Sequence, residues 1–312
     1  MIRKIKDFLH EIVYSPCGTA TLTLLVILLI AIFNFVNMGL LSSNNDWMIP
    51  MIALSFLAPF FLFKATHGGK KYELTTHKNL PKKYHIPTIV FSILLLAFGS
   101  TLLKLAFVSE KYVELPLYNA FFAHRNGKLL NDLYLVLAFC VIPPVLEGII
   151  FRGIMIKEHD KQGRMTTAIF SAFFFALLSF SFELFIPKFF LGIILCIVLY
   201  ATDSLATSVA IHIAYNFFAV FVEPTFVSVK NVSSNYELFA FLVAIVTLIV
   251  AILLLSHLSR LYRKYSHDKF GKNETRSTPR ERTFWSLATL LTSIPAIACY
   301  VLFVVVTIIT NK

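Results

Sequence analysis

Two short stretches of the sequence place polar and ionisable side chains inside long apolar segments. The stretch PPVLEGIIFRG, residues 143–153, contains Glu147 and Arg152, and the stretch HIAYN contains His212 and Asn216. A carboxylate that is shielded from bulk water can act as a general base toward a water molecule. An imidazole and an amide can donate hydrogen bonds to the oxyanion of a tetrahedral intermediate. These residue types therefore favour acyl-transfer chemistry on a peptide bond.

The spacing of these residues predicts that they lie at a similar depth in a membrane. Glu147 lies ten residues before Lys157, about 15 Å from the cytoplasmic end of its helix at 1.5 Å per residue. If the later helix starts near Ser204, His212 and Asn216 lie about 12 and 18 Å from the same side. Their i, i+4 spacing puts both on one helix face. A single membrane His or Asn is commonly an interhelical hydrogen-bond donor, so it is the shared depth that favours a joint site.

The composition indicates which elements must hold these side chains. The chain has 312 residues, of which 57% are hydrophobic and 14% are charged, whereas soluble domains carry about 25% charged residues. The sequence therefore predicts an all-α, polytopic transmembrane helix bundle with about nine spans (eight to nine). The candidate spans lie at about 19–41, 46–63, 87–108, 132–156, 166–186, 188–201, 204–222, 236–256 and 284–309. The fifth and sixth are nearly continuous, and we expect a tight hairpin around Pro187.

The distribution of basic residues predicts the orientation of the bundle. With the N-terminus in the cytoplasm, 20 of the 28 Lys and Arg residues lie in cytoplasmic segments and six lie outside. This distribution follows the positive-inside rule, so the net charge of +11 reflects topology, and we expect no nucleic-acid partner. Lys104 lies near the outer end of its span and is expected to snorkel to the surface. We expect a multi-pass protein in contact with the lipid of a cell membrane, the cytoplasmic membrane of a bacterium.

The chain divides by composition into three predicted parts. They are residues 1–86, with an N-terminal surface helix and two added spans; residues 87–226, the core bundle; and residues 227–312, two C-terminal spans with a basic cytoplasmic loop. The four cysteines form no CxxC pair. We therefore expect no disulfide, no metal site and no cofactor.

The two polar stretches resemble motifs of the CAAX protease and bacteriocin-processing family, the CPBP or Abi group of intramembrane peptidases. That family carries EExxxR, often as EExxFRG, then FxxxH, then HxxxN or HxxxD, on successive helices. Here EGIIFRG matches at Glu147, Phe151, Arg152 and Gly153, and HIAYN matches completely. The resemblance covers about residues 130–220. It implies that Glu147 helps to activate the hydrolytic water and that His212 and Asn216 form an oxyanion hole.

The sequence departs from the family pattern at two positions. The second Glu of the first motif is Gly148, and the His of the second motif is Ser179, four residues after Phe175. In the family, that His shares the hydrolytic water with the first Glu. A Ser hydroxyl can hydrogen-bond to water, but it does not exchange a proton near neutral pH as His does. Because loss of such a group typically lowers the rate by about 10²–10⁴, the resemblance implies impaired proteolysis.

Ser179 and Glu183 leave alternatives open. Glu183 lies four residues after Ser179 and so on the same predicted helix face, about 6 Å further toward the outside, where it is a candidate substitute for the missing His. Ser179 is a candidate nucleophile if Glu147 or His212 activates it. The ordinary interpretations are a Ser bonded to its own helix backbone and a Glu at the membrane surface.

Several classes of function fit these observations. The chain is predicted to be an endopeptidase-like protein that cleaves or binds a membrane-anchored peptide or a lipidated protein. The alternative is a non-catalytic scaffold, immunity or regulatory partner protein, in which the polar residues form a satisfied network between helices. An acyltransferase acting through the same site is a weaker alternative. A transporter is weaker still, because no inverted repeat is evident.

Overall fold

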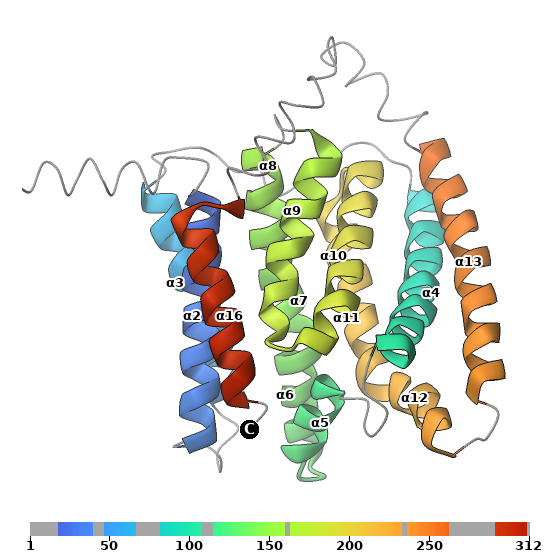
Figure 1. Ribbon diagram of the computed structural model, residues 1–312, viewed down its shortest axis with the longest axis horizontal. Coiled ribbons are helices and arrows are strands. Elements are labelled where there is room, and N and C mark those ends of the chain that lie inside the picture. Colours follow the sequence, from blue (N-terminus) through green and yellow to red (C-terminus); the bar gives the residue numbers. More distant parts are fainter. Residues whose placement is uncertain are drawn as a thin grey trace, which may run out of the picture. The chain divides into compact units, whose positions relative to one another are not determined.

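The described part of the chain is almost entirely helical. The computed structural model describes residues 18–39, 47–66, 82–107, 115–159, 163–232, 236–261 and 291–310. These ranges contain helices and short turns but no strand (Figure 1). The all-α prediction is therefore confirmed. The predicted N-terminal surface helix and most of the basic loop lie outside the described residues.

The described helices follow one another along the chain. The first are α2 (Gly18–Gly39), α3 (Met48–Thr66), α4 (Lys82–Phe107) and α5 (Pro116–Ala123). A continuous helical segment then contains α6 (Leu129–Val136), η2 (Leu137–Val141), α7 (Ile142–Glu147), η3 (Gly148–Met155) and α8 (Ile156–His159). The rest are α9 (Arg164–Ala176), η5 (Leu177–Ser179), α10 (Phe182–Thr202), α11 (Leu205–Phe221), α12 (Glu223–Val232), α13 (Tyr236–Leu261) and α16 (Ile294–Thr310). The segments η2 and η3 are π-helical, and η5 is a 3₁₀ turn.

Five of the described helical segments are long and apolar enough to cross a membrane. They are Met48–Thr66, Lys83–Ala106, Leu129–His159, Phe182–Thr202 and Tyr236–Leu261. A sixth span is formed if α11 and α12, which are bent by 49° relative to each other, count together. Three shorter apolar helices, Gly18–Phe33, Arg164–Ser179 and Ile294–Ile309, occupy the positions of other predicted spans. The prediction of a helical membrane protein is confirmed. Within the described residues, five to six segments could span a membrane by length and composition, and the count of about nine spans stays a prediction.

The break between the fifth and sixth predicted spans is not at Pro187. The helix instead ends in the 3₁₀ turn Leu177–Ser179, and Phe180 follows with a left-handed φ of 47°. Pro187 lies inside α10, which begins at Phe182. Burial of the Phe180 ring, 8% exposed, stabilises this turn although left-handed backbone is unfavourable for an L-residue. The expectation that Ser179 and Glu183 share a helix face is therefore wrong, because they belong to different helices.

The described residues form two compact units. Those of the first unit lie within residues 1–74, 146–182 and 278–312, and those of the second lie within residues 75–145 and 183–277. The division into residues 1–86, 87–226 and 227–312 stays a prediction.

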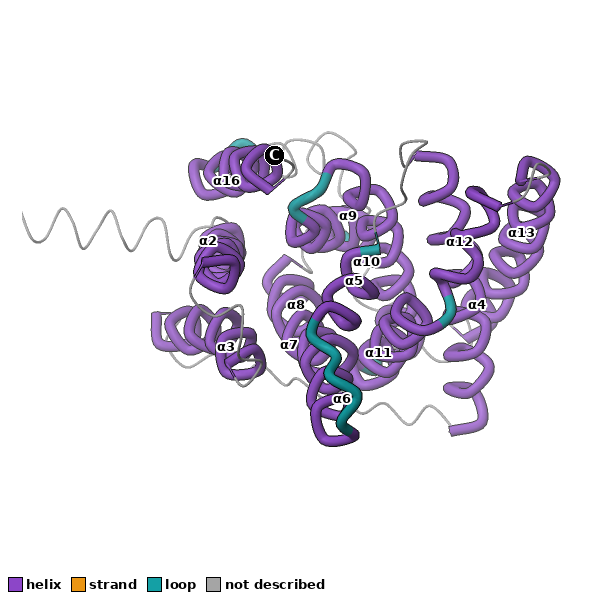
Figure 2. Tube along the Cα trace, turned by 90° about the horizontal axis from the view of Figure 1, so that it is seen from below, coloured by secondary structure: helices purple, strands orange, loops and turns teal. Residues whose placement is uncertain are grey.

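Within the first unit, α2 packs beside α3 and beside α16 (Figures 1 and 2). The hydroxyl of Thr19 on α2 lies 2.6 Å from Nε2 of His159 on α8, and the thiol of Cys299 on α16 donates to the Ala20 carbonyl at 3.7 Å. These buried polar contacts tie three apolar helices together.

Within the second unit, α4 packs along α13 and also contacts α11 (Figures 1 and 2). Ser204 caps the N-terminus of α11, because its hydroxyl accepts a hydrogen bond from the Thr207 N–H at 3.2 Å. The helix therefore begins where the sequence placed it. Further along α11, the hydroxyl of Ser208 donates to the Leu195 carbonyl of α10 at 3.1 Å, which fixes the two helices against each other.

The backbone geometry of the turn between α10 and α11 predicts how substitutions of Asp203 affect stability. Asp203 has a left-handed φ of 50°, and its N–H donates to the Leu199 carbonyl at 2.7 Å, which closes α10. Asp203→Gly is expected to hold or slightly raise the Tm. Asp203→Val is expected to lower it by about 2–4 °C, because a β-branched residue is disfavoured in this region. Thermal unfolding in detergent measures both, and equal Tm values for the two variants would contradict the assignment.

Candidate active site

The first motif lies in a buried, irregular part of the segment Leu129–His159. Glu147 is the last residue of α7 and is 7% exposed. The π-helical segment η3 starts at the next residue, Gly148. Short π-helical segments are uncommon and frequently occur at functional sites, because the extra residue in the turn alters which side chains face the interior. Glu147 is thus held at a place where the regular helix is interrupted.

The first and second motifs pack directly against each other in the first unit. The guanidinium carbon of Arg152 lies 4.5 Å from the ring centroid of Phe175, a cation–π contact, and Arg152 is 3% exposed. The rings of Phe151 and Phe175 meet edge to face with centroids 5.6 Å apart. The Ser171 hydroxyl donates to the Phe151 carbonyl at 2.6 Å. These contacts give Arg152 and both aromatic motif residues a packing role between η3 and α9.

Ser179 and Glu183 flank the turn between α9 and α10. The hydroxyl of Ser179 donates to the Ser181 carbonyl at 3.1 Å, so it bonds to nearby backbone. Glu183 lies in the first turn of α10, where a carboxylate interacts favourably with the helix dipole. The roles predicted for Ser179 and Glu183, catalytic or ordinary, stay predictions.

The third motif lies on α11 in the second unit. His212 and Asn216 are 2% and 6% exposed, and their spacing places them on one face of a regular helix. The side-chain amide Nδ2 of Asn216 donates to the backbone carbonyl of Phe139 in η2 at 3.0 Å. This bond fixes which end of the amide carries the donors, because only the NH₂ group can donate to a carbonyl.

The candidate residues divide between the two units. Glu147, Arg152 and Ser179 belong to the first, and Glu183, His212 and Asn216 belong to the second. The meeting of Glu147 with His212 and Asn216 at one site therefore stays a prediction. Among the described residues, no group of three or more His, Cys, Asp or Glu side chains could hold a metal ion.

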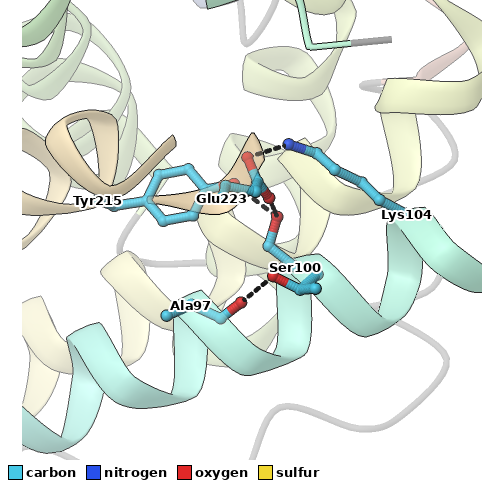
Figure 3. A network of polar contacts seen from close by, with 6 residues as sticks. Ala97, Ser100, Lys104, Tyr215 and Glu223 are labelled. Atoms are coloured by element: carbon cyan, nitrogen blue, oxygen red, sulfur yellow. Dashed lines mark hydrogen bonds and ion pairs between the residues drawn. The ribbon is translucent and has the colours of Figure 1, made fainter. Parts of the chain in front are cut away.

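A buried polar network that the sequence analysis did not find lies in the second unit (Figure 3). Lys104 is 6% exposed, and its Nζ lies 2.6 Å from Oε2 of Glu223, which is fully buried. The hydroxyl of Ser100 lies 2.6 Å from the Tyr215 hydroxyl and donates to Oε1 of Glu223 at 3.3 Å. The expectation that Lys104 snorkels to the surface is wrong, because a buried carboxylate pairs with it.

The sequence held a partial indication of this network. Ser100 and Lys104 have i, i+4 spacing in an apolar helix, and Tyr215 directly precedes Asn216 in the third motif. Glu223 follows the apolar run of α11 and stands before Pro224, a position typical of a loop. The structure places it instead at the start of α12, at the 49° bend. The network therefore joins α4, α11 and α12.

The apolar helices, with polar groups buried between them, define a multi-pass, all-α membrane protein. Residues 129–218 match the family model described as Rce1-like, type II CAAX prenyl endopeptidase Rce1-like. The match confirms the resemblance to the CAAX protease (CPBP) family that the motifs indicate. It spans all three motif positions. No curated protein and no solved structure matches the chain.

Burial of the Lys104–Glu223 ion pair predicts how loss of one or both charges affects stability. Lys104→Met leaves the Glu223 carboxylate buried without its cation, and the free energy of unfolding is expected to fall by about 3–5 kcal/mol. The double variant Lys104→Met/Glu223→Gln removes both charges with little change of volume and is expected to recover most of that loss. Thermal unfolding in detergent measures both.

The matched control for this experiment is Lys64→Met, the same substitution at an exposed position near the end of α3. It is expected to change the free energy of unfolding by less than about 0.5 kcal/mol. The structural role of the pair is contradicted if Lys104→Met is as stable as Lys64→Met.

Proposed function

We propose that the protein is an intramembrane endopeptidase of the CAAX protease type, with Glu147 as the base and His212 and Asn216 as oxyanion donors. The observation that carries the proposal is that the family match includes the first and third motifs, whose polar residues are all buried. Keeping an ionisable carboxyl group and an imidazole within membrane spans is unfavourable unless they are used or paired. The proposal requires the two units to bring these residues to one site.

One helical segment carries two of the groups that the proposed mechanism uses. The amide of Asn216 bonds to the carbonyl of Phe139, and Phe139 lies eight residues before Glu147 along the segment Leu129–His159. The same helical segment therefore carries the proposed base and the backbone group that orients one proposed oxyanion donor.

The proposed reaction is the hydrolysis of a peptide bond. Glu147 takes a proton from a water molecule as the water oxygen attacks the scissile carbonyl carbon. The carbonyl oxygen becomes an oxyanion and accepts hydrogen bonds from His212 and Asn216. The C–N bond then breaks, and the proton held by Glu147 passes to the leaving nitrogen. Ser179 stands where the family has a His, so the water has one fewer group that can exchange protons, and we expect slow turnover.

The proposed substrate is a peptide that is anchored in the membrane or carries a lipid. This follows from the burial of the candidate residues in apolar helices and from the family description, which names a CAAX prenyl endopeptidase. The second candidate function is a non-catalytic protein that binds such a peptide. The presence of Ser179 and Gly148 at two motif positions favours this candidate.

The catalytic role of Glu147 is tested with an internally quenched peptide that ends in a farnesylated CAAX sequence. The wild-type protein in proteoliposomes is expected to cleave it, and Glu147→Gln is expected to lower kcat by about 10²-fold or more because the base is lost. The Tm of the variant is expected to stay within a few degrees of the wild type, because Gln has nearly the same volume as Glu.

The matched control is Glu237→Gln, the same substitution at an exposed position at the start of α13, which is expected to leave cleavage unchanged. Cleavage that survives Glu147→Gln would overturn the assignment of the base. If Glu147→Gln yields no folded protein while Glu237→Gln folds normally, a structural role of Glu147 is supported instead.

Because Ser179 stands where the family motif has a His, we expect substitution of Ser179 by His to raise the activity. Ser179→His restores the missing imidazole and is expected to raise kcat by about 10²-fold or more in the same assay. Ser179→Ala is expected to change kcat only a few-fold, because the hydroxyl bonds to the Ser181 carbonyl. If Ser179→Ala abolishes cleavage, Ser179 is the nucleophile. If neither the wild type nor Ser179→His cleaves the peptide, the non-catalytic candidate is favoured.

A further inference from the structure

Two adjacent prolines interrupt the backbone hydrogen bonds of the segment Leu129–His159. Pro143 and Pro144 lie in α7, and neither has a backbone N–H. In an α-helix the N–H of residue i bonds to the carbonyl of residue i−4, and in a π-helix it bonds to that of residue i−5. The carbonyl of Phe139 would be served by residue 143 in the first pattern and by residue 144 in the second. Both patterns therefore leave this carbonyl without an intrahelical donor.

The next possible donor is also engaged. Residue 142 could serve the Phe139 carbonyl through a 3₁₀-type bond, but the N–H of Ile142 bonds to the carbonyl of Leu137. This bond is π-helical and belongs to η2. The carbonyl of Phe139 consequently needs a partner from another helix, because an unpaired carbonyl within a membrane protein is strongly unfavourable.

Asn216 supplies that partner. Its Nδ2 donates to the Phe139 carbonyl at 3.0 Å, and its side chain is buried. An amide nitrogen carries two N–H groups, so one bond to Phe139 leaves the second available to a ligand oxygen. The bond also resists rotation of the amide, because rotation would leave the carbonyl unpaired.

We propose that Pro143 and Pro144 are positioning residues for Asn216: by removing both intrahelical donors of the Phe139 carbonyl, they make that carbonyl a fixed acceptor that orients the Asn216 amide. The catalytic part of this inference rests on the proposed function, in which Asn216 donates to the oxyanion. The structural part, the dependence of the Asn216 bond on the prolines, does not.

A double-variant cycle in the full-length protein tests the structural part without any substrate. Asn216→Ala alone leaves the Phe139 carbonyl without a donor and is expected to lower the Tm by about 2–6 °C. Pro143→Ala returns an N–H to the α-helical position that serves this carbonyl. In the Pro143→Ala background, Asn216→Ala is therefore expected to lower the Tm by less than half as much. Equal losses of Tm in the two backgrounds would overturn the proposal.

The cycle has a matched control in the same unit. Pro187→Ala makes the same substitution within α10, and in that background Asn216→Ala is expected to lower the Tm as much as in the wild type. If Asn216→Ala alone yields no folded protein, recovery of folded protein by adding Pro143→Ala supports the proposal. Recovery by Pro187→Ala but not by Pro143→Ala contradicts it.

The catalytic part is tested with the quenched farnesylated CAAX peptide. Pro143→Ala is expected to lower kcat about tenfold or more with KM within twofold, because a small misplacement of a donor affects the transition state more than binding. Its Tm is expected to hold or rise, since a proline within the helix is replaced. Unchanged kcat in Pro143→Ala overturns the catalytic part when the wild type cleaves the peptide. Absence of cleavage by the wild type overturns the proposed function, while the Tm cycle still decides the structural part.

Discussion

The structure depends on one constraint: within the hydrocarbon region of a membrane, each polar group must find its partner inside the protein. Several hydroxyls on the spans meet this requirement locally, as when the Thr101 hydroxyl donates to the Ala97 carbonyl one turn earlier at 2.8 Å. The Phe139 carbonyl and the Lys104 ammonium have no such local solution. Their partners, Asn216 and Glu223, come from distant parts of the sequence. The polar residues thus specify which apolar helices lie side by side.

The same constraint applies to the polar network around Lys104 and to the candidate site. The Lys104–Glu223 pair with Ser100 and Tyr215 closes on itself, since each charged group has an opposite charge or hydroxyls within reach. Glu147 instead sits between regular helix and a π-helical segment. Asn216 has one N–H committed to backbone and a second available for chemistry. The closed network is suited to stability, whereas the role that we propose for Glu147 and Asn216 is a catalytic one.

The sequence predicted the helical membrane class, the start of α11 near Ser204 and the resemblance to the CAAX protease family, because apolar run length and motif spacing are local properties. It failed where the outcome depended on tertiary partners. The position of Lys104 near the outer end of its span predicts snorkelling, and the residues around it do not reveal its remote partner, Glu223. The sequence predicts the break between the fifth and sixth spans at Pro187, but α10 tolerates this proline. The chain turns instead at Phe180, whose left-handed backbone is stabilised by burial of its aromatic ring. The neighbouring residues in the sequence indicate neither the ion pair of Lys104 nor the turn at Phe180.

Tyr215 and Asn216 are adjacent on α11 and point about 100° apart around the helix axis. Tyr215 is bonded to Ser100 on α4, and Asn216 is bonded to the Phe139 carbonyl in η2. Rotation of α11 about its own axis would break both bonds at once. The two bonds therefore fix the rotational position of α11 within the second unit.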